Sequence, residues 1–530
     1  MTSIAKGASY IALLGLTAGL AWPALAADET PVRGGTLIVT LGGDPPTVNP
    51  NVSSGVPDGI IGCAVHQGLT EISAKGLPKP MLAKSWTISP DGKTYTFELN
   101  KAVFHDGKPM TSADVKYSLM EVSAKLSPQF ASAGRMIEDV DTSDPYRAVV
   151  KLKNAYGPLL LQLACGMGAA ILPKHVFEGT NVLQNPATTS KPIGTGAFAF
   201  QEWKRGDHIR LARNTDYWEP GKPYLDGVVA KIIAQAPART QALQAGEVDF
   251  VSYYYFPSSD QKTAMADPKL SVTPGVTAPS LDYLFLNVLN KPLDDKRVRQ
   301  ALLIATDREY LLKNGWLGMG NVGVSPFTSA LAWTVNPEVD YRKMYPFDTA
   351  KANALLDEAG YKRGADGNRF SLRAVYVNDE VDFTQVIQAL KSMWRAVGVD
   401  VIIDAAERAT ALKRVYIDHD FDLHINGYTS YGDPAIGLAR SFVTSSIGKP
   451  YANASSYSNP AVDDLFQKGE TAPSQDARAA IYREVQALLA QEVPVYTLRE
   501  KQLSDVQSVR LQWDHDEMFF ISWRNAWLKK

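Results

Sequence analysis

The sequence predicts an α/β protein built from about three lobes. Its second half alternates amphipathic helical stretches with short strand-like runs, a pattern typical of an α/β lobe. Its 530 residues correspond to about three domains at roughly 150 residues each. With 45% hydrophobic and 21% charged residues, the chain has the composition of a globular protein that can bury sizeable cores.

The second half contains the segments with the clearest periodicity. The predicted helices, which have the apolar spacing of amphipathic helices, are residues 297–313, 350–359, 383–397 and 474–490. The predicted strands, which lie among these helices, are residues 371–377, 400–405 and 421–426.

The first half predicts a more mixed arrangement. Residues 86–99 alternate apolar and polar side chains around a turn at residues 89–92, which predicts a β-hairpin. Residues 111–125 and 236–245 have the start and stop signals of helices. The uncharged run 157–172 is shorter than a membrane span and is predicted to be a buried helix.

The first 26 residues predict a cleaved secretory signal. Lys6 precedes an apolar run over residues 11–22, and Ala24 and Ala26 form an A-x-A cleavage site. The run has about 12 residues, whereas a membrane span needs about 20. We therefore expect an exported, soluble chain that starts at Ala27, and no cysteine lies near the cut to indicate a lipoprotein.

Charge and cysteine content exclude several classes of protein. Lysine and arginine number 54 against 56 acidic residues, so the net charge of −2 argues against a nucleic-acid or anionic-membrane binder. Two cysteines cannot build a disulfide framework or a four-cysteine zinc site. In an oxidising compartment Cys63 and Cys165 either pair or remain two separate buried thiols, and the sequence leaves both alternatives open.

Motifs for catalysis or for cofactor binding are missing from the sequence. None of the seven histidines stands in an H-E-x-x-H motif or at zinc spacing beside a cysteine. Residues 318–323 match G-x-G-x-x-G, but they follow a predicted helix and not a strand. The polar cluster at residues 419–424 is predicted to be a strand edge. We therefore expect no cofactor, no metal and no enzyme activity.

Aromatic residues gather in two turn-rich segments that follow predicted strands. The candidate ligand contacts in these segments are Tyr253, Tyr254, Tyr428, Ser430, Tyr431 and Asp433. Rings beside a few polar groups are typical of a ligand cleft, because rings supply contact area and polar groups orient the ligand. The alternative is that the tyrosines seal the edges of lobes. Asp433 is the stronger candidate because α/β lobes present ligand groups at the carboxyl ends of strands.

Five segments in order carry a resemblance to a known family. Residues 82–119 combine a hairpin, F-H-D-G and a helix, with Asn100 where a basic residue is usual. Residues 192–218 contain G-T-G-x-F and R-N-x-x-Y-W. The remaining segments are RTQALQAGEVD at 239–249, LNKPLDDKRVRQAL at 289–302 and AKANALLDEAGY at 350–361. The chain resembles the family 5 extracellular solute-binding proteins of ABC importers over nearly its whole mature length.

The resemblance implies a bilobal periplasmic-binding-protein (flytrap) fold with an extra subdomain. Lobe I is expected to combine residues 27–55, 190–275 and 501–530, the extra subdomain to span residues 56–189, and lobe II residues 276–500. The implied function is the periplasmic substrate-binding component of an ABC importer. Such a protein is expected to be a monomer that captures a peptide-like or other small polar solute and delivers it to an inner-membrane permease. The alternative of another class is an exported hydrolase on the same lobes.

One departure from the family bears on the ligand. In peptide-binding members, an aspartate three residues before the acidic residue of the D-P or E-P loop pairs with the peptide ammonium, and that position here is Ser430. Residues 376–380 also lack the arginine that holds the carboxylate in dipeptide binders. We therefore expect a ligand other than a short free peptide held at both termini: an opine, a blocked or longer peptide, or a glycoside. Asp433 is the alternative partner for a cation, and His419 or His424 would serve a nickel chelate.

Overall fold

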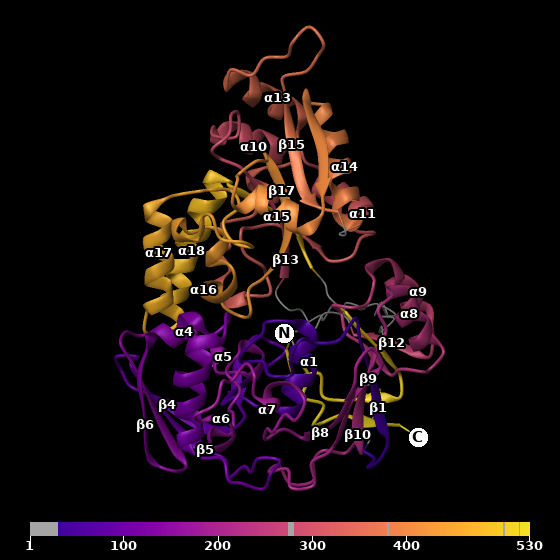
Figure 1. Ribbon diagram of the computed structural model, residues 1–530. Helices are drawn as coiled ribbons and strands as arrows, with labels where there is room; N and C mark the ends of the chain where they lie inside the picture. Colours follow the sequence, from indigo (N-terminus) through magenta and orange to yellow (C-terminus); the bar gives the residue numbers. More distant parts are fainter. Residues whose placement is uncertain (1–29, 274–279, 379–380, 502–503, 519, 530) are drawn as a thin grey trace, which may run out of the picture.

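The structure, a computed structural model, describes residues 30–273, 280–378, 381–501, 504–518 and 520–529. Figure 1 shows two units side by side at the base of the molecule and a third unit above them. We name each unit by its sheet: lobe I has seven strands, the subdomain has four, and lobe II has six. The fold is α/β and bilobal with an additional unit, as predicted.

Lobe I joins strands from three distant parts of the chain. In spatial order they are β12 (Leu270–Thr273), β19 (Asp505–Ser508), β11 (Phe250–Val251), β1 (Thr36–Leu41), β10 (Gly227–Ile232), β9 (His208–Arg213) and β8 (Phe198–Lys204). The central strand β1 runs parallel to β10 and β11. Its alternate residues Leu37, Val39 and Leu41 are fully buried, which is the period-2 pattern of a strand with one covered face.

Short helices cover the sheet of lobe I. They are α1 (Val56–Val65), α8 (Ala236–Gln244) and α9 (Gln261–Ala266). Helix α1 contributes Ile60, Ile61, Ala64 and Val65 to the core around β1, although the expected boundary at residue 56 assigns it to the extra subdomain. The domain boundaries given above otherwise stay a prediction. A small ladder of β20 (Leu511–Gln512) and β21 (Trp527–Leu528) lies near the C-terminus.

The subdomain has an antiparallel sheet with its own core. Its strands in spatial order are β4 (Ala83–Ile88), β5 (Thr94–Leu99), β7 (Arg147–Leu152) and β6 (Ile137–Asp144). Strands β4 and β5 are the predicted hairpin. A separate ladder pairs β2 (Thr70–Ile72) with β3 (Pro78–Pro80). The short helices are α2 (Ser112–Lys116), α3 (Ala124–Leu126), α4 (Ala131–Met136), α5 (Leu159–Gln162), α6 (Lys174–Phe177) and α7 (Pro186–Thr189).

Two helix predictions in the subdomain need correction. The helix predicted over residues 111–125 starts as expected, with Thr111 and Asp114 forming a capping box, but it continues as a π-helical segment, Tyr117–Ser123, before α3. The predicted buried helix at residues 157–172 is wrong in form. Only α5 is α-helical: Ala164 is extended, a 3₁₀ turn covers Cys165–Met167, and Gly168 in the left-handed conformation ends that turn. The segment is nevertheless buried, as expected.

A disulfide joins lobe I to the subdomain. Cys63 lies on α1, Cys165 lies in the 3₁₀ turn after α5, and their Cα atoms are 5.8 Å apart. The sequence left open whether the two cysteines pair or stay separate thiols, and in the structure they form a disulfide. Val122, Leu172 and Phe177 pack around it in a small apolar cluster.

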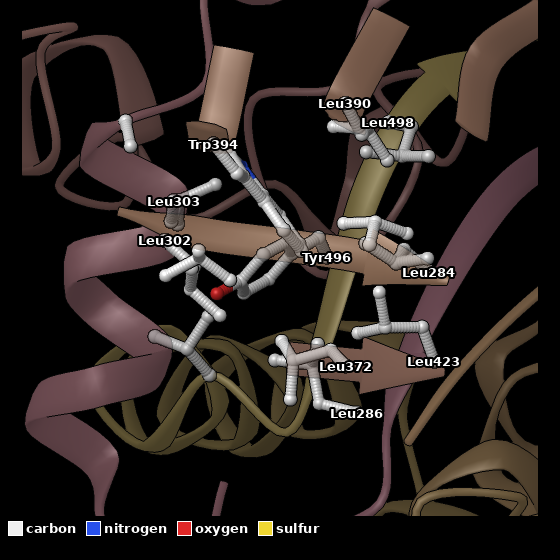
Figure 2. Packing of buried hydrophobic residues seen from close by; sticks show 14 of the residues in the cluster. Leu284, Leu286, Leu302, Leu303, Leu372, Leu390, Trp394, Leu423, Tyr496 and Leu498 are labelled. Carbon is white, nitrogen blue, oxygen red and sulfur yellow. The ribbon is translucent and has the colours of Figure 1, made fainter. Parts of the chain in front are cut away.

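Lobe II alternates strands and helices as predicted. Its strands in spatial order are β14 (Asn321–Val322), β18 (Val495–Glu500), β13 (Ser280–Leu286), β17 (Leu423–Thr429), β15 (Phe370–Val377) and β16 (Val399–Ala406). Its helices are α10 (Lys296–Ile304), α11 (Arg308–Gly315), α12 (Tyr341–Met344), α13 (Thr349–Glu358), α14 (Val381–Arg395), α15 (Arg408–Tyr416), α16 (Pro434–Gly437), α17 (Pro460–Thr471) and α18 (Gln475–Glu492). Figure 2 shows leucines of the strands meeting those of α10 and α14 around Trp394 and Tyr496.

Two predicted boundaries in lobe II also need correction. The helix predicted over residues 297–313 is two helices, because Asp307 caps α11 through a bond from the backbone N–H of Tyr310. The strand predicted at residues 421–426 is β17, which starts at Leu423 and runs on to Thr429. The side chain of Asn287 donates to the carbonyl oxygens of His419 and Phe421, which keeps these residues out of the ladder.

The chain passes twice between the two lobes. Strand β12 ends at Thr273 and β13 starts at Ser280, while β18 ends at Glu500 and β19 starts at Asp505. Thr273 pairs with Asp505 in lobe I, and Leu281 pairs with Glu500 in lobe II. The ends of the two connections are therefore neighbours in each lobe, as in a two-stranded hinge. Across the described ranges, no helix combines the length and the apolarity that crossing a membrane requires.

Candidate functional site

A hollow of about 540 Å³ lies where the subdomain, lobe II and the C-terminal segment meet. Its wall consists of residues 74–77, residues 330–333, Gly432, Gln475 and Met518. Lys75 is the charged residue of this wall, and most of the other side chains are apolar. A mainly apolar wall with few polar groups is typical of a small-molecule site.

A second hollow of about 260 Å³ continues the first. The two share Gly76, Leu77, Trp333, Gly432 and Gln475, so together they form one groove between the subdomain and lobe II. The far end of this groove is lined by aromatic and charged groups, which include Tyr95, Tyr156, Asp433 and Arg478.

Asp433 and Arg478 form a buried ion pair in the groove wall. The two guanidinium nitrogens lie 2.6 and 2.7 Å from the two carboxylate oxygens, and the side chains are 7% and 2% exposed for Arg478 and Asp433. Burial opposes the charge of Arg478, but the carboxylate holds the pKa of the guanidinium above its ordinary value. Asp433 also caps α16 by accepting from the backbone N–H of Ala435. The prediction that Asp433 takes a ligand cation therefore needs correction, because its charge is already neutralised within the protein.

Tyr428 lies in the core of lobe II and not at the groove. It belongs to β17, is 3% exposed, and its hydroxyl bonds to the hydroxyl of Tyr416 at 3.0 Å and to the carbonyl of Ala452 at 3.2 Å. Tyr283 and Phe285 pack beside its ring. We therefore leave Tyr428 out of the site: its ring and hydroxyl are already occupied.

Ser430 is fully buried directly after β17. Its hydroxyl has no hydrogen-bond partner within the described residues, while its carbonyl accepts from the backbone N–H of Asp433 at 3.1 Å. A buried hydroxyl without a partner is costly, so this position is unusual for a structural residue. Its role as a ligand contact stays a prediction.

Tyr253, Tyr254 and Tyr431 follow strands of the two lobes. Tyr253 and Tyr254 follow β11 of lobe I, and Tyr431, with φ of 54°, follows β17 of lobe II. Burial raises the pKa of Tyr253 well above its usual value, with smaller contributions from Asp505 and Tyr431. Tyr254 is 60% exposed and packs edge-on against Tyr255. Tyr431 packs against an apolar cluster of the subdomain and the C-terminal segment that includes Ile72, Leu161 and Met518.

The two histidines considered for a nickel chelate have structural roles. His424 is 1% exposed, and burial lowers its pKa to about 4. Its Nδ1 lies 2.9 Å from the carbonyl of Val375, within the sheet of lobe II. The Nδ1 of His419 lies 3.0 Å from the hydroxyl of Ser456. In the described ranges, no three histidine, cysteine, aspartate or glutamate side chains lie together in a way that could hold a metal ion.

Two residues of the groove wall were missed by the sequence analysis: Trp333 and Arg478. Arg478 lies in the first turns of a predicted amphipathic helix, where an arginine is normally solvated. Trp333 lies in a short 3₁₀ turn, which leaves no periodic pattern in the sequence. No local pattern marks such residues, because their partners are distant in sequence.

The family model, the similar proteins and the solved structures that match this chain all describe bacterial binding proteins. The family model described as bacterial extracellular solute-binding proteins, family 5 middle, matches residues 78–449. The oligopeptide-binding protein AppA of Bacillus subtilis (strain 168) is 29% identical over 483 residues, covering 88% of this chain and 86% of AppA. The glutathione-binding protein GsiB of Escherichia coli O1:K1 / APEC is 27% identical over 515 residues, covering 95% of each chain.

Solved structures extend the comparison to the fold. The ABC transporter substrate-binding protein CtaP of Listeria monocytogenes superposes with a TM-score of 0.81 at 26% identity, covering 94% of this chain and 100% of CtaP. These relatives are transport-associated binding proteins, and the alternative of an exported hydrolase finds no support among them.

Proposed function

This chain belongs to the family 5 extracellular solute-binding proteins, the substrate-binding components of ABC importers, and we propose that it holds its solute in the groove between the subdomain and lobe II. The observation that carries the proposal is the hollow of about 540 Å³ at the junction of the subdomain, lobe II and the C-terminal segment. Residues from three parts of the fold line it, so a bound solute would bridge units that can move relative to one another.

Binding of the solute shifts the equilibrium between the open and closed forms of the protein. The two neighbouring connections between the lobes allow them to rock apart, and a solute that contacts both sides of the groove favours the closed form. A permease in the inner membrane then receives the solute from the closed protein. No bond is made or broken, so the protein needs no catalytic group.

The solute is peptide-like or another small polar molecule, and it is not a short free peptide held at both termini. Three features support this specificity. Ser430 offers a neutral hydroxyl, and Asp433 is neutralised by Arg478. Among the described residues that form the wall of the larger hollow, none carries a carboxylate. An opine, a blocked or longer peptide, or a glycoside fits these features. Among the relatives, the names of AppA and GsiB refer to oligopeptide and glutathione.

The protein acts as a soluble monomer in the periplasm after cleavage of its signal behind Ala26. The A-x-A site and the short apolar run of the first 26 residues support export. N-terminal sequencing of the protein recovered from periplasm tests the cleavage, and light scattering tests the monomeric state.

Native mass spectrometry of the protein purified from periplasm without refolding tests the proposed function. We expect a discrete extra mass, which gives the composition of the retained solute. Calorimetric titration with di- and tripeptides then tests the specificity: weak or absent binding is expected, and tight binding would refute it. A protein that retains no solute and shows no thermal stabilisation by peptides, opines or glycosides would contradict the function itself.

A further inference from the structure

The turn between β2 and β3 of the subdomain places Lys75 on the wall of the larger hollow. The turn has a fixed shape, because the carbonyl of Leu77 accepts from the backbone N–H of Ser73 at 2.9 Å and the hydroxyl of Ser73 accepts from the N–H of Leu77 at 3.1 Å. Lys75 itself is exposed, and no acidic side chain of the described residues forms an ion pair with it. Its charge is therefore available to a solute.

Lys75 also decides the charge balance of the groove wall. The other charged side chains among the described residues that line the two hollows are Asp433 and Arg478, and these two neutralise each other at 2.6 Å. The described wall thus has one positive charge without a counter-charge. An anionic group that enters the groove gains a charge-assisted hydrogen bond from Lys75, whereas a cationic group finds its carboxylate already taken.

Trp333 forms an apolar wall of the groove and is held in place by its neighbours. It lines both hollows. The guanidinium of Arg478 lies 5.2 Å from the centre of its ring, and the ring of Tyr482 packs edge-on against it at 5.8 Å. The carbonyl of the next residue, Thr334, accepts from Nε2 of Gln486 on α18 at 2.6 Å. A ring fixed in this way loses little freedom when a solute packs on it.

Leu77 supplies a second apolar surface from the subdomain side. It lines both hollows and is 45% exposed. Gly76 and Gly432 line both hollows too, and a Cβ atom on Gly432 would lie 2.9 Å from the carbonyl oxygen of Gly76. The two units therefore approach through their backbones, and the two glycines add no side chain to the stretch that both hollows share. Leu77 and Trp333 thus offer a solute two apolar surfaces from different units.

We propose that the groove binds an amphipathic anion: an apolar group of the solute packs between Trp333 and Leu77, and its anionic group pairs with Lys75. This inference rests on the proposed function and narrows the class of solute. A blocked peptide or an opine that has a free carboxylate and an apolar side chain fits, and a glycoside without an anionic group does not. The subdomain then takes a direct part in selecting the solute, since both Lys75 and Leu77 belong to it.

The test uses two dyes with the same rings that differ by one anionic group. They are 8-anilinonaphthalene-1-sulfonate and the uncharged N-phenyl-1-naphthylamine, and their fluorescence is titrated with dialysed protein. We expect wild type to bind the sulfonate at least fivefold more tightly than the uncharged dye. Lys75→Gln should lose this preference. Lys84→Gln, which changes an exposed lysine of β4 that lines neither hollow, should keep it.

A second variant tests the apolar contact. Leu77→Ala removes exposed apolar surface, so the protein should fold as wild type does while its affinity for both dyes falls by roughly three- to tenfold. Leu183→Ala is the matched control, because Leu183 is 57% exposed on the same subdomain and lines neither hollow. Its affinity for both dyes should equal that of wild type.

The solute that wild type retains gives an independent measurement. Released from the protein and added back, it should displace the sulfonate dye, and its composition should include an anionic group and an apolar group. Equal binding of both dyes to wild type, a sulfonate preference that survives in Lys75→Gln, or wild-type affinity in Leu77→Ala overturns the inference. A retained solute that is neutral or cationic, or that leaves the dye bound, refutes it while the proposed function stands. Retention of no solute, together with no thermal stabilisation by peptides, opines or glycosides, contradicts the proposed function instead.

Discussion

The guanidinium of Arg478 donates a hydrogen bond to each carboxylate oxygen of Asp433, with nitrogen–oxygen distances of 2.6 and 2.7 Å. Arg478 comes from α18, while Asp433 caps the start of α16, so the pair ties two helices of lobe II behind the groove. The guanidinium also lies 5.2 Å from the centre of the Trp333 ring, a wall of the groove. This pair is thus an almost fully buried charge interaction within the groove wall.

Breaking the pair from one side should destabilise lobe II strongly. Asp433→Asn keeps an oxygen that can cap α16 but leaves the charge of Arg478 buried without a partner, and we expect a loss of about 3–5 kcal/mol in unfolding free energy. Urea unfolding measures it. Arg478→Met should cost a similar amount, while the double variant should lose much less than the sum, because no charge remains buried alone. Additive losses would contradict a coupled pair.

The disulfide between Cys63 and Cys165 should stabilise the junction of lobe I and the subdomain. It closes a loop with a sequence separation of 102 residues, and for a loop of this size the chain-entropy account gives about 4–5 kcal/mol. We expect Cys63→Ser combined with Cys165→Ser to lose about this amount in urea unfolding. Wild type in reductant is the matched control and should behave like the double variant. If reduction leaves the unfolding midpoint of wild type unchanged, the bond does not stabilise the fold.

The sequence correctly predicted the elements that depend on residues close together in the chain. The capping box of Thr111 and Asp114 placed a helix start correctly, since both residues lie within one turn. The single helix predicted over residues 297–313 is wrong, because Asp307 caps a second helix that starts at Arg308. Helical periodicity alone does not reveal such a break.

The candidate site was only partly predictable, because its geometry depends on distant contacts. Tyr428 was assigned to a loop because β17 was predicted to end at Asn426. The strand continues to Thr429, so pleating turns the Tyr428 ring into the core of lobe II. Arg478 neutralises Asp433 from 45 residues away, and no sequence pattern states that pairing.

His66 should make the protein sensitive to acid. It is fully buried, and neither ring nitrogen has a hydrogen-bond partner in the described part of the chain. Burial, with a smaller contribution from His105, lowers its pKa to about 3, against about 6.5 in an unfolded chain. Between these values the unfolded state binds the extra proton, so the stability contributed by neutral His66 is complete above about pH 6.5 and is lost as the pH falls toward 3.

The corresponding experiment replaces His66 with a side chain of similar shape that does not titrate. Unfolding free energy of His66→Phe, measured between pH 7 and 4, should fall less steeply than that of wild type, by up to about 1.4 kcal/mol per pH unit. The comparison uses the slopes of unfolding free energy against pH. The cost of imperfect packing around Phe is the same at every pH and therefore does not affect these slopes. Equal slopes for the two proteins would rule out His66 as the acid-sensitive group.

Gly157 should control how closely the subdomain approaches lobe II. Its backbone N–H donates to the carbonyl of Glu470 at 2.9 Å across the edge of the groove. A Cβ atom at this position would lie 2.7 Å from Nε of Arg478. Arg478 cannot move aside without losing Asp433 and its bond to the carbonyl of Gly469. Gly157 does not adopt the left-handed conformation, so alanine introduces no backbone strain there and acts through this contact alone.

Gly157→Ala should therefore favour the open form. We expect faster hydrogen exchange at the residue 157 amide, a larger radius of gyration in solution scattering, and affinity for the retained solute reduced by roughly five- to tenfold, since overpacking by one methyl costs about 1 kcal/mol or more. Gly43→Ala is the control, because a Cβ there meets no atom within 4 Å and no left-handed backbone is involved. A Gly157→Ala protein with wild-type exchange and affinity would show that the two units do not close at this contact.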